Sequence, residues 1–240
     1  MCYRQRMERP ERYAIPWDAP FREQIAKALR PGGRVLDVGG GRSPTLRPEQ
    51  RRDLDAYVGL DVSRAELGAA PDGVYTECVT SDVIQRVAAL EGRFDLVVSF
   101  QVLEHVRPIE TALENLHAYL APGGTLVAQF SGGRSVFALA DRVIPRRIAR
   151  LVLERLVGRP SETIFPVHYD RCWYGALDEL LADWCDVEIL PVYWGMDYFA
   201  FSEPLQRLYV GYENWLHAGD RRDWAPYYVV KARRAEPAPA

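Results

Sequence analysis

Short apolar runs alternate with amphipathic segments from about residue 34 to residue 131. Runs of strand length lie at 34–38, 56–62, 73–78, 94–100 and 124–130. Apolar residues repeat at helical spacing in 21–30, 82–90 and 109–120. This alternation predicts a parallel sheet with helices on both faces. The run FDLVVSF (94–100) is continuously apolar, which is typical of a central strand buried on both sides.

The second half of the chain has a different pattern. An arginine-rich amphipathic stretch, 134–160, is interrupted by Pro145. Helices are predicted around 174–184 and at 201–216, with further strands at 186–194 and 224–232. We therefore expect one domain over 1–240, with an acceptor-side insertion or lid at 132–172 and a disordered tail at 233–240.

Composition narrows the class of protein. Hydrophobic residues make up 48% of the 240, enough for a large core, and the formal net charge of −3 gives no overall attraction to nucleic acid. The four cysteines form no CxxC pair, so we expect reduced thiols and a cytoplasmic location. No signal-peptide pattern and no run of 18 apolar residues is seen.

A glycine-rich turn, DVGGGRSP, follows the first predicted strand at 37–44. A phosphate loop would need a Gly-Lys pair that is absent here. A dinucleotide fingerprint, GxGxxG, fits Gly39 and Gly41 but meets Pro44 at its third position. The turn alone does not decide between a dinucleotide and another nucleoside ligand.

Three carboxylates near this turn favour a nucleoside that is not a dinucleotide. Asp61 ends the second strand, where a carboxylate can accept both ribose hydroxyls. Asp82 can accept from an exocyclic amine, and the Val83 N–H can donate to a ring nitrogen. Asp37 would repel a pyrophosphate and attract an ammonium group, directly or through water.

The segments DVGGG, GLDVS, TSDV, FDLVVSFQVLEHV and LAPGGTLV occur in the order and spacing of class I S-adenosylmethionine-dependent methyltransferases. The chain resembles this family over about 20–131, and within it the small-molecule branch that carries LEHV after the fourth strand. The resemblance implies a seven-stranded, mostly parallel sheet with its last strand antiparallel. The sequence departs from the family pattern at Ser43, where the family often has a further glycine.

The same resemblance implies roles for residues that bind the methyl donor. The methionine and ribose side would be lined by Asp37, Gly39, Gly40 and Gly41. Asp61 would bind the ribose hydroxyls and Val62 would pack on the adenine. The adenine edge would be recognised by Asp82 and Val83. Phe100 and Gln101, at the end of the fourth strand, would lie beside the reactive methyl group.

Histidine suits the general base that activates a hydroxyl for methylation. His105 follows the fourth strand, at the edge of the sheet where ligands bind, although it could simply belong to the start of a helix. His168 lies in FPVHYD, after the arginine-rich stretch, although it could simply be a loop histidine bonded to Asp170. Sugar methyltransferases sometimes use a divalent ion, for which Asp170, Glu162 and Asp197 are candidates, but no spacing singles them out.

The acceptor side carries seven arginines against two acids in 134–160. This segment could receive an anionic or lipid-linked acceptor or rest on a membrane surface, or it could be an ordinary surface helix. We predict methylation of a hydroxyl on a sugar, glycan or natural product. The alternatives are N-methylation of an amine, an NAD(P)-binding reductase, and a non-catalytic module that binds the donor.

Overall fold

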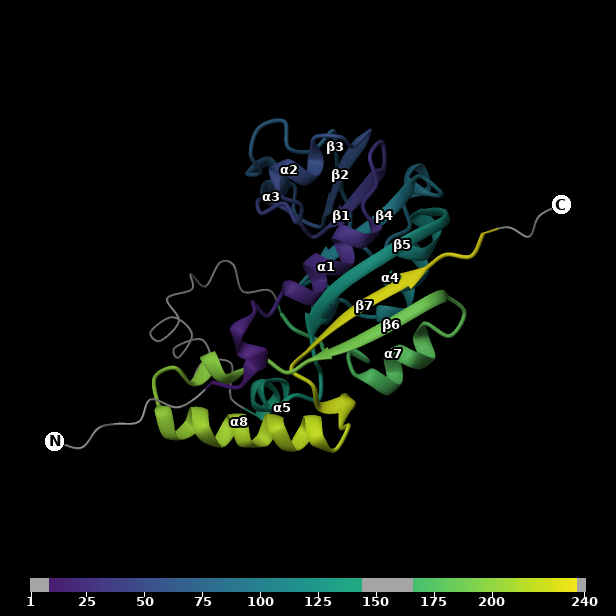
Figure 1. Cartoon of the computed structure of the whole chain (residues 1–240). Helices are drawn as coiled ribbons and strands as arrows, with labels where there is room; N and C mark the ends of the chain where they lie inside the picture. Colours follow the sequence, from purple (N-terminus) through teal and green to yellow (C-terminus); the bar gives the residue numbers. More distant parts are fainter. Residues whose placement is uncertain (1–8, 144–165, 237–240) are drawn as a thin grey trace.

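The computed structural model describes residues 9–143 and 166–236, and within them a seven-stranded sheet (Figure 1). The strand order is β3-β2-β1-β4-β5-β7-β6. Only β7 is antiparallel to its neighbours, which confirms the class I methyltransferase fold expected from the sequence. The strands span β1 (Arg34–Val38), β2 (Ala56–Asp61), β3 (Glu77–Thr80), β4 (Phe94–Phe100), β5 (Leu120–Ser131), β6 (Cys185–Val192) and β7 (Tyr227–Arg233).

Helices cover both faces of the sheet. On one face, α1 inserts Phe21 and Ile25 into a cluster with Val35, Leu96 and Val127 of the central strands. On the other face, α4 and α7 pack on a larger cluster. The helices are α1 (Ala19–Ala28), α2 (Pro48–Arg51), α3 (Arg64–Gly68), α4 (Ile109–Tyr119), α5 (Val136–Val143), α7 (Tyr174–Leu180) and α8 (Glu203–Ala218). Short 3₁₀ turns are η1 (Glu11–Ala14), η2 (Ala88–Leu90), η3 (Leu103–His105), η6 (Met196–Phe199) and η7 (Arg222–Trp224).

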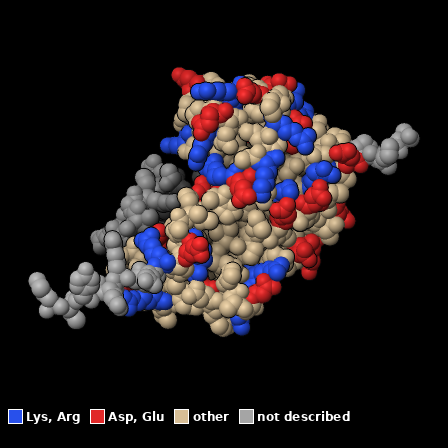
Figure 2. All heavy atoms as spheres, viewed as in Figure 1, with Lys and Arg blue, Asp and Glu red and all other residues tan. Residues whose placement is uncertain are grey.

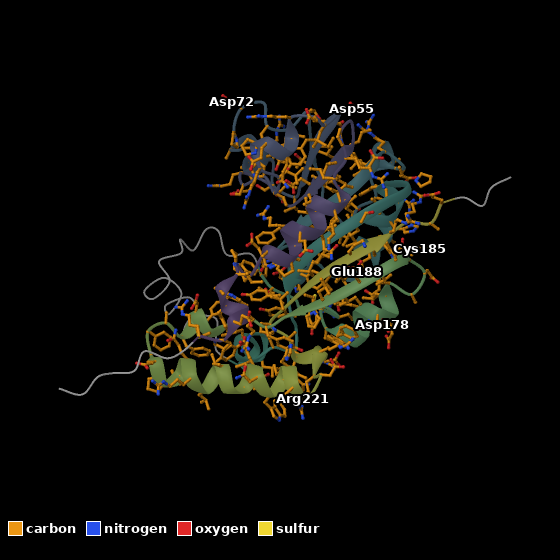
Figure 3. All side chains as sticks on the ribbon, viewed as in Figure 1. Asp55, Asp72, Asp178, Cys185, Glu188 and Arg221 are labelled. Carbon is orange, nitrogen blue, oxygen red and sulfur yellow. The ribbon has the colours of Figure 1, made fainter. Side chains whose placement is uncertain are left out.

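The last helix, α8, lies along one edge of the molecule, away from β1–β3 (Figure 1). It packs with η1 and η6 through a separate cluster that contains Tyr13, Met196 and Tyr209. At the far edge of the sheet, Glu188 of β6 (labelled in Figure 3) accepts a hydrogen bond from Gln24 of α1 and pairs with Lys231 of β7. The first helix is thereby connected to the last two strands.

The structure corrects three details of the sequence prediction. The expected helix at 82–90 is an irregular segment that ends in η2. Two α4 side chains bind its backbone: Asn115 donates to the Val83 carbonyl, and the Val87 N–H donates to the Tyr119 hydroxyl, both at 2.9 Å. These two bonds satisfy backbone groups of the segment that would otherwise bond to each other within a helix. The third strand lies at 77–80 rather than 73–78.

The tail begins later than residue 233. Arg233 is the last residue of β7, and Arg234 exchanges backbone hydrogen bonds with Gly123 and Gly124. The Arg234 guanidinium also donates to the Leu120 carbonyl at 2.6 Å. These bonds order the segment because they occupy its backbone groups.

The predicted insertion begins with α5, and its residues 144–165 lie outside the described ranges. Its role as a lid, and the membrane contact expected through 134–160, therefore stay predictions. No helix in 9–143 or 166–236 is both long and apolar enough to cross a membrane. On the face shown in Figure 2, acidic and basic side chains are interspersed.

Candidate functional site

A pocket of about 320 Å³ lies at the carboxyl ends of β1, β2 and β4. This is the edge of a parallel sheet at which α/β proteins bind ligands. Eight of the residues predicted from the sequence line it: Gly39, Asp61, Val62, Asp82, Val83, Gln101, His105 and His168. Asp37, Gly40, Gly41 and Phe100 are not part of the lining.

Asp61 ends β2 with its side chain in the pocket lining and is 9% exposed. Its Oδ1 accepts a hydrogen bond from the Ser63 N–H at 2.8 Å. Burial raises the pKa of this carboxyl group, the Ser63 bond opposes that rise, and nearby Glu66 adds to it. The result is a carboxylate of fixed orientation that can accept further hydrogen bonds from a ligand.

Asp82 and Val83 follow β3 and line the pocket beside Asp61. The Asp82 Oδ1 accepts from the Ile84 N–H at 3.1 Å, which fixes the carboxylate in an Asx-type turn. The Val83 side chain is buried in the core, whereas Val62, also in the pocket lining, is 59% exposed. An apolar surface and a carboxylate therefore lie together, as a purine ring with an amino group would require.

The backbone of the glycine turn lies very close to neighbouring side chains. Gly39 has φ +74°, and a Cβ placed on it would lie 2.2 Å from Cγ2 of Val102. A Cβ on Gly40 would lie 2.4 Å from Oδ2 of Asp37. Glycine is therefore required at both positions by space, and at Gly39 by backbone conformation as well.

Asp37 lies behind this turn rather than in the pocket lining. It is fully buried, and its carboxylate accepts from the Thr45 N–H at 2.8 Å and from the Thr45 hydroxyl at 2.6 Å. The hydroxyls of Tyr57 and Tyr75 also donate to it. Burial raises its pKa against these donors. In this structure Asp37 closes the turn, and its contact with a ligand stays a prediction.

The two candidate bases, His105 and His168, line the same pocket although 63 positions separate them in sequence. The His105 Nδ1 lies 2.9 Å from the carbonyl oxygen of Pro166. A carbonyl can only accept, so Nδ1 carries the hydrogen and the neutral ring keeps its lone pair on Nε2. This is the tautomer that a general base at Nε2 needs.

Glu104 connects the segments that carry these histidines. Its backbone carbonyl accepts from the N–H groups of His168 and Tyr169, both at 2.9 Å. Its side chain is buried, and Oε1 accepts from the Ser131 N–H at 3.2 Å. Burial raises the pKa of this carboxyl, and the neighbouring His105 opposes the rise. The end of β5 and the 166–169 segment are thus fixed to η3.

Phe100 and Gln101 lie at the end of β4 and face different surroundings. Gln101 lines the pocket with φ +57°, and its side-chain oxygen accepts from the Ser131 hydroxyl at 3.2 Å. The Phe100 ring packs instead on Trp17 and Phe21, at centroid distances of 5.4 and 5.1 Å. Phe100 therefore belongs to the α1 face of the sheet.

The metal candidates do not form a site in the part of the chain that is described. Asp170 accepts from the Ile109 N–H at 3.1 Å, and Asp197 lies 3.7 Å from Arg9. Glu162 lies outside the described residues. No three His, Cys, Asp or Glu side chains within 9–143 and 166–236 are grouped so that they could hold a metal ion.

Comparison with known families decides the class. The model of a family described as "Methyltransferase domain" matches residues 6–164, more than half of the chain. This chain belongs to the methyltransferase-domain family. The match covers β1 to β5 and therefore most of the pocket lining.

Curated relatives of this methyltransferase domain match only in part. It is 32% identical over 112 residues to a ubiquinone biosynthesis O-methyltransferase of Bradyrhizobium sp. (strain ORS 278), covering 44% of this chain and 43% of that protein. It is 30% identical over 158 residues to the enzyme of the same name from Rhizobium rhizogenes, covering 60% and 62%. The chain thus spans about half the length of these relatives.

A solved structure supports the fold of the methyltransferase domain. An S-adenosylmethionine-dependent methyltransferase from Archaeoglobus fulgidus superimposes with a TM-score of 0.56 at 18% identity, covering 93% of this chain and 97% of that one.

Several pocket residues of the methyltransferase domain were not anticipated from the sequence. Val102, Arg107 and Pro166 line the pocket. Val102 and Arg107 flank the LEHV segment at 103–106, so a prediction based on that segment could have included them. Pro166 comes from a distant segment, and only the folded chain shows that its carbonyl orients His105.

Proposed function

We propose that this chain binds S-adenosylmethionine and transfers its methyl group to a hydroxyl oxygen, with a sugar, glycan or other natural product as the acceptor. The observation that carries this proposal is a single pocket lined by Asp61, Asp82, His105 and His168. The family match and the O-methyltransferase relatives support the same reaction class.

The pocket residues offer the chemistry that binding of the donor requires. Asp61 accepts hydrogen bonds from the ribose hydroxyls, Val62 packs on the adenine, and Asp82 accepts from its amino group. Gly39 lets the Val102 side chain pack directly against the turn, because any side chain at position 39 would collide with that valine. When bound, S-adenosylmethionine supplies a methyl group attached to a positively charged sulfur.

His105 acts as the general base in this proposal. The acceptor oxygen forms its bond to the methyl carbon as the carbon–sulfur bond breaks, and the hydroxyl proton passes to Nε2 of His105. The bond from Nδ1 to the Pro166 carbonyl selects the tautomer of the neutral ring whose lone pair is on Nε2. A positioned base of this kind accelerates such a step by roughly 10²–10⁴-fold. His168, on the opposite segment of the lining, is the second candidate.

Binding and turnover test the proposal separately. Calorimetry is expected to show one site for S-adenosylhomocysteine and none for NAD. The reverse result would overturn the assignment of the donor. Methyl transfer from labelled S-adenosylmethionine across sugars, phenols and amines then identifies the acceptor, and methylation of amines alone would replace O-methylation by N-methylation.

Histidine variants test the base. His105→Ala is expected to lower turnover by about 10²–10⁴-fold while S-adenosylhomocysteine still binds. The matched control is His117→Ala, because His117 lies on α4, where its ring packs against Trp184. Full activity of His105→Ala, together with loss of activity in His168→Ala, would assign the base to His168.

A further inference from the structure

A second group of side chains lies beside the donor pocket, on the α1 face of the sheet. Trp17, in the segment before α1, packs on Phe100 of β4 and Tyr227 of β7, with ring centroids 5.4 and 4.8 Å away. Both ring pairs are tilted at 40°. Trp17 and Phe100 are partly exposed, whereas Tyr227 is buried. Aromatic faces of this kind stack on planar or ring-shaped ligands.

Strand register places a polar side chain among these rings. Gln129 of β5 is paired with Phe100 on one side and Val229 on the other, and the next residue on the same face, Ser131, is paired with Tyr227. Residues paired across strands project from the same face of a sheet. Gln129 is therefore on the face that carries Phe100 and Tyr227.

Gln129 has an unmet need for hydrogen bonds. It is 0% exposed, and neither its side-chain oxygen nor its side-chain nitrogen has a partner among the described residues. Leaving a buried amide unsatisfied is unfavourable, and native proteins rarely do so without a ligand or water to complete it. Gln129 therefore adds to this face of the sheet an amide that can both donate and accept.

This group is adjacent to the region where methyl transfer would occur. Gln101, which lines the donor pocket, directly follows Phe100, and its side chain accepts from the hydroxyl of Ser131. Tyr227 forms a 2.7 Å hydrogen bond with the hydroxyl of Tyr198. Phe100 of this aromatic group thus directly precedes Gln101 of the pocket lining.

We propose that Trp17, Phe100 and Tyr227 form the binding site for the ring of the methyl acceptor, with the amide of Gln129 bonding to a polar substituent of that ring. This proposal rests on the proposed function and deepens it. The acceptor is a cyclic molecule whose flat face stacks on Trp17. A phenol and a sugar both offer such a face and carry hydroxyl groups.

Ligand-observed NMR on the full chain saturated with S-adenosylhomocysteine tests this site. The probes are 3,4-dihydroxybenzoate for the phenol, methyl α-glucoside for the sugar, and glycerol as a hydroxyl compound without a ring. At least one ring probe is expected to bind and glycerol is not. Trp17→Ala should weaken ring binding by about tenfold. The matched control is Trp215→Ala, because Trp215 is a half-exposed tryptophan on α8.

A second variant separates ligand binding from folding. Gln129→Leu removes the unpartnered amide, so its melting temperature should not fall, whereas ring binding should weaken. Unchanged ring binding in both Trp17→Ala and Gln129→Leu would overturn the proposal, as would failure of both ring probes to bind the wild-type chain. If S-adenosylhomocysteine itself does not bind, the proposed function fails instead.

Discussion

The ionisation of Asp61 sets a pH dependence for donor binding at the scale of one residue. Burial raises the pKa of this carboxyl. It therefore gains a proton at a higher pH than an exposed aspartate would, and the protonated group accepts ribose hydroxyls less well. We expect the affinity for S-adenosylhomocysteine to be constant near neutral pH and to fall as the pH is lowered toward the raised pKa.

Calorimetry over a pH series measures this effect, with circular dichroism to confirm that the chain stays folded. The control is Asp61→Asn, which should bind weakly at every pH because its amide does not ionise in this range. Parallel pH profiles for the wild type and Asp61→Asn would show that another group controls binding.

Gly39 is the residue at which the turn tolerates least change. Gly39→Ala introduces a Cβ 2.2 Å from Val102 at φ +74°. The left-handed conformation alone costs about 1–2 kcal/mol for a residue with a side chain. Because Val102 lines the pocket and must move, we expect S-adenosylhomocysteine affinity to fall at least tenfold. Calorimetry and thermal unfolding measure the two effects.

Gly211 provides the matched glycine for that experiment. It lies within α8, and a Cβ there would have no neighbour within 4 Å. Gly211→Ala should therefore stabilise the chain by roughly 0.5–1 kcal/mol without changing donor affinity. If Gly39→Ala behaves like Gly211→Ala, the close approach to Val102 is not essential for binding.

The sequence predicted about half of the pocket lining at this scale because those residues follow strand ends. Asp61 ends a strand and Asp82 and His105 follow strands, and parallel strands bring those positions to one edge. Trp17 and Pro166 could not be predicted in the same way. Their places depend on contacts with residues far away in the chain, as the pairs Trp17–Tyr227 and His105–Pro166 show.

At the scale of elements, the N-terminal turn η1 is fixed to α8 by one buried hydroxyl. The hydroxyl of Tyr13 accepts from the N–H groups of Gly195 and Met196, at 3.1 and 3.0 Å, and donates to Glu213. Glu213 is fully buried and also binds Arg12 at 3.1 Å. This network joins the start of the chain to its last helix.

Tyr13→Phe should lower the free energy of unfolding by about 1–3 kcal/mol, because the Met196 N–H loses its acceptor in a buried place. Urea unfolding measures the change. The control is Asn214→Ala, which removes an exposed contact with the same Arg12 and should cost less than about 0.5 kcal/mol. Equal effects of the two substitutions would mean that the buried hydroxyl is not the stabilising group.

Elements were predictable where burial leaves a pattern in the sequence. The bounds of β1 and β4 agree with their apolar runs, since both strands are largely buried. The edge strand β3 is mostly exposed, so its residues carry no such pattern and its position was predicted a few residues too early. The helical spacing in 82–90 was misleading because α4 side chains, rather than a helix, satisfy that backbone.

At the scale of the whole molecule, the strand order places the proposed sites for donor and acceptor at neighbouring strand ends of one sheet. The donor pocket uses the ends of β1, β2 and β4, whereas the proposed ring site uses β4, β5 and β7. The strand order makes β4 the neighbour of both β1 and β5. Phe100 and Gln101 at its end are therefore the residues through which the two sites meet.

This arrangement predicts how donor binding stabilises the entire chain. A ligand that binds only the folded state at 100 times its dissociation constant adds about 2.7 kcal/mol. For a domain of this size, that corresponds to a rise in melting temperature of roughly 5–10 °C. The α8 cluster lies outside the pocket lining but is joined to the sheet through η1 and the segment after β6. If the chain unfolds as one unit, α8 should share the full rise.

Far-ultraviolet circular dichroism and tryptophan fluorescence, recorded with and without S-adenosylhomocysteine, test this prediction. Both probes should report the same increase in melting temperature. Trp194 and Trp215 lie near α8 and outside the pocket lining, but they would unfold together with the sheet. Asp61→Ala at the same ligand concentration should lose most of the increase. A fluorescence transition that stays in place while the dichroism transition moves would show that α8 and its cluster unfold independently of the donor-binding half.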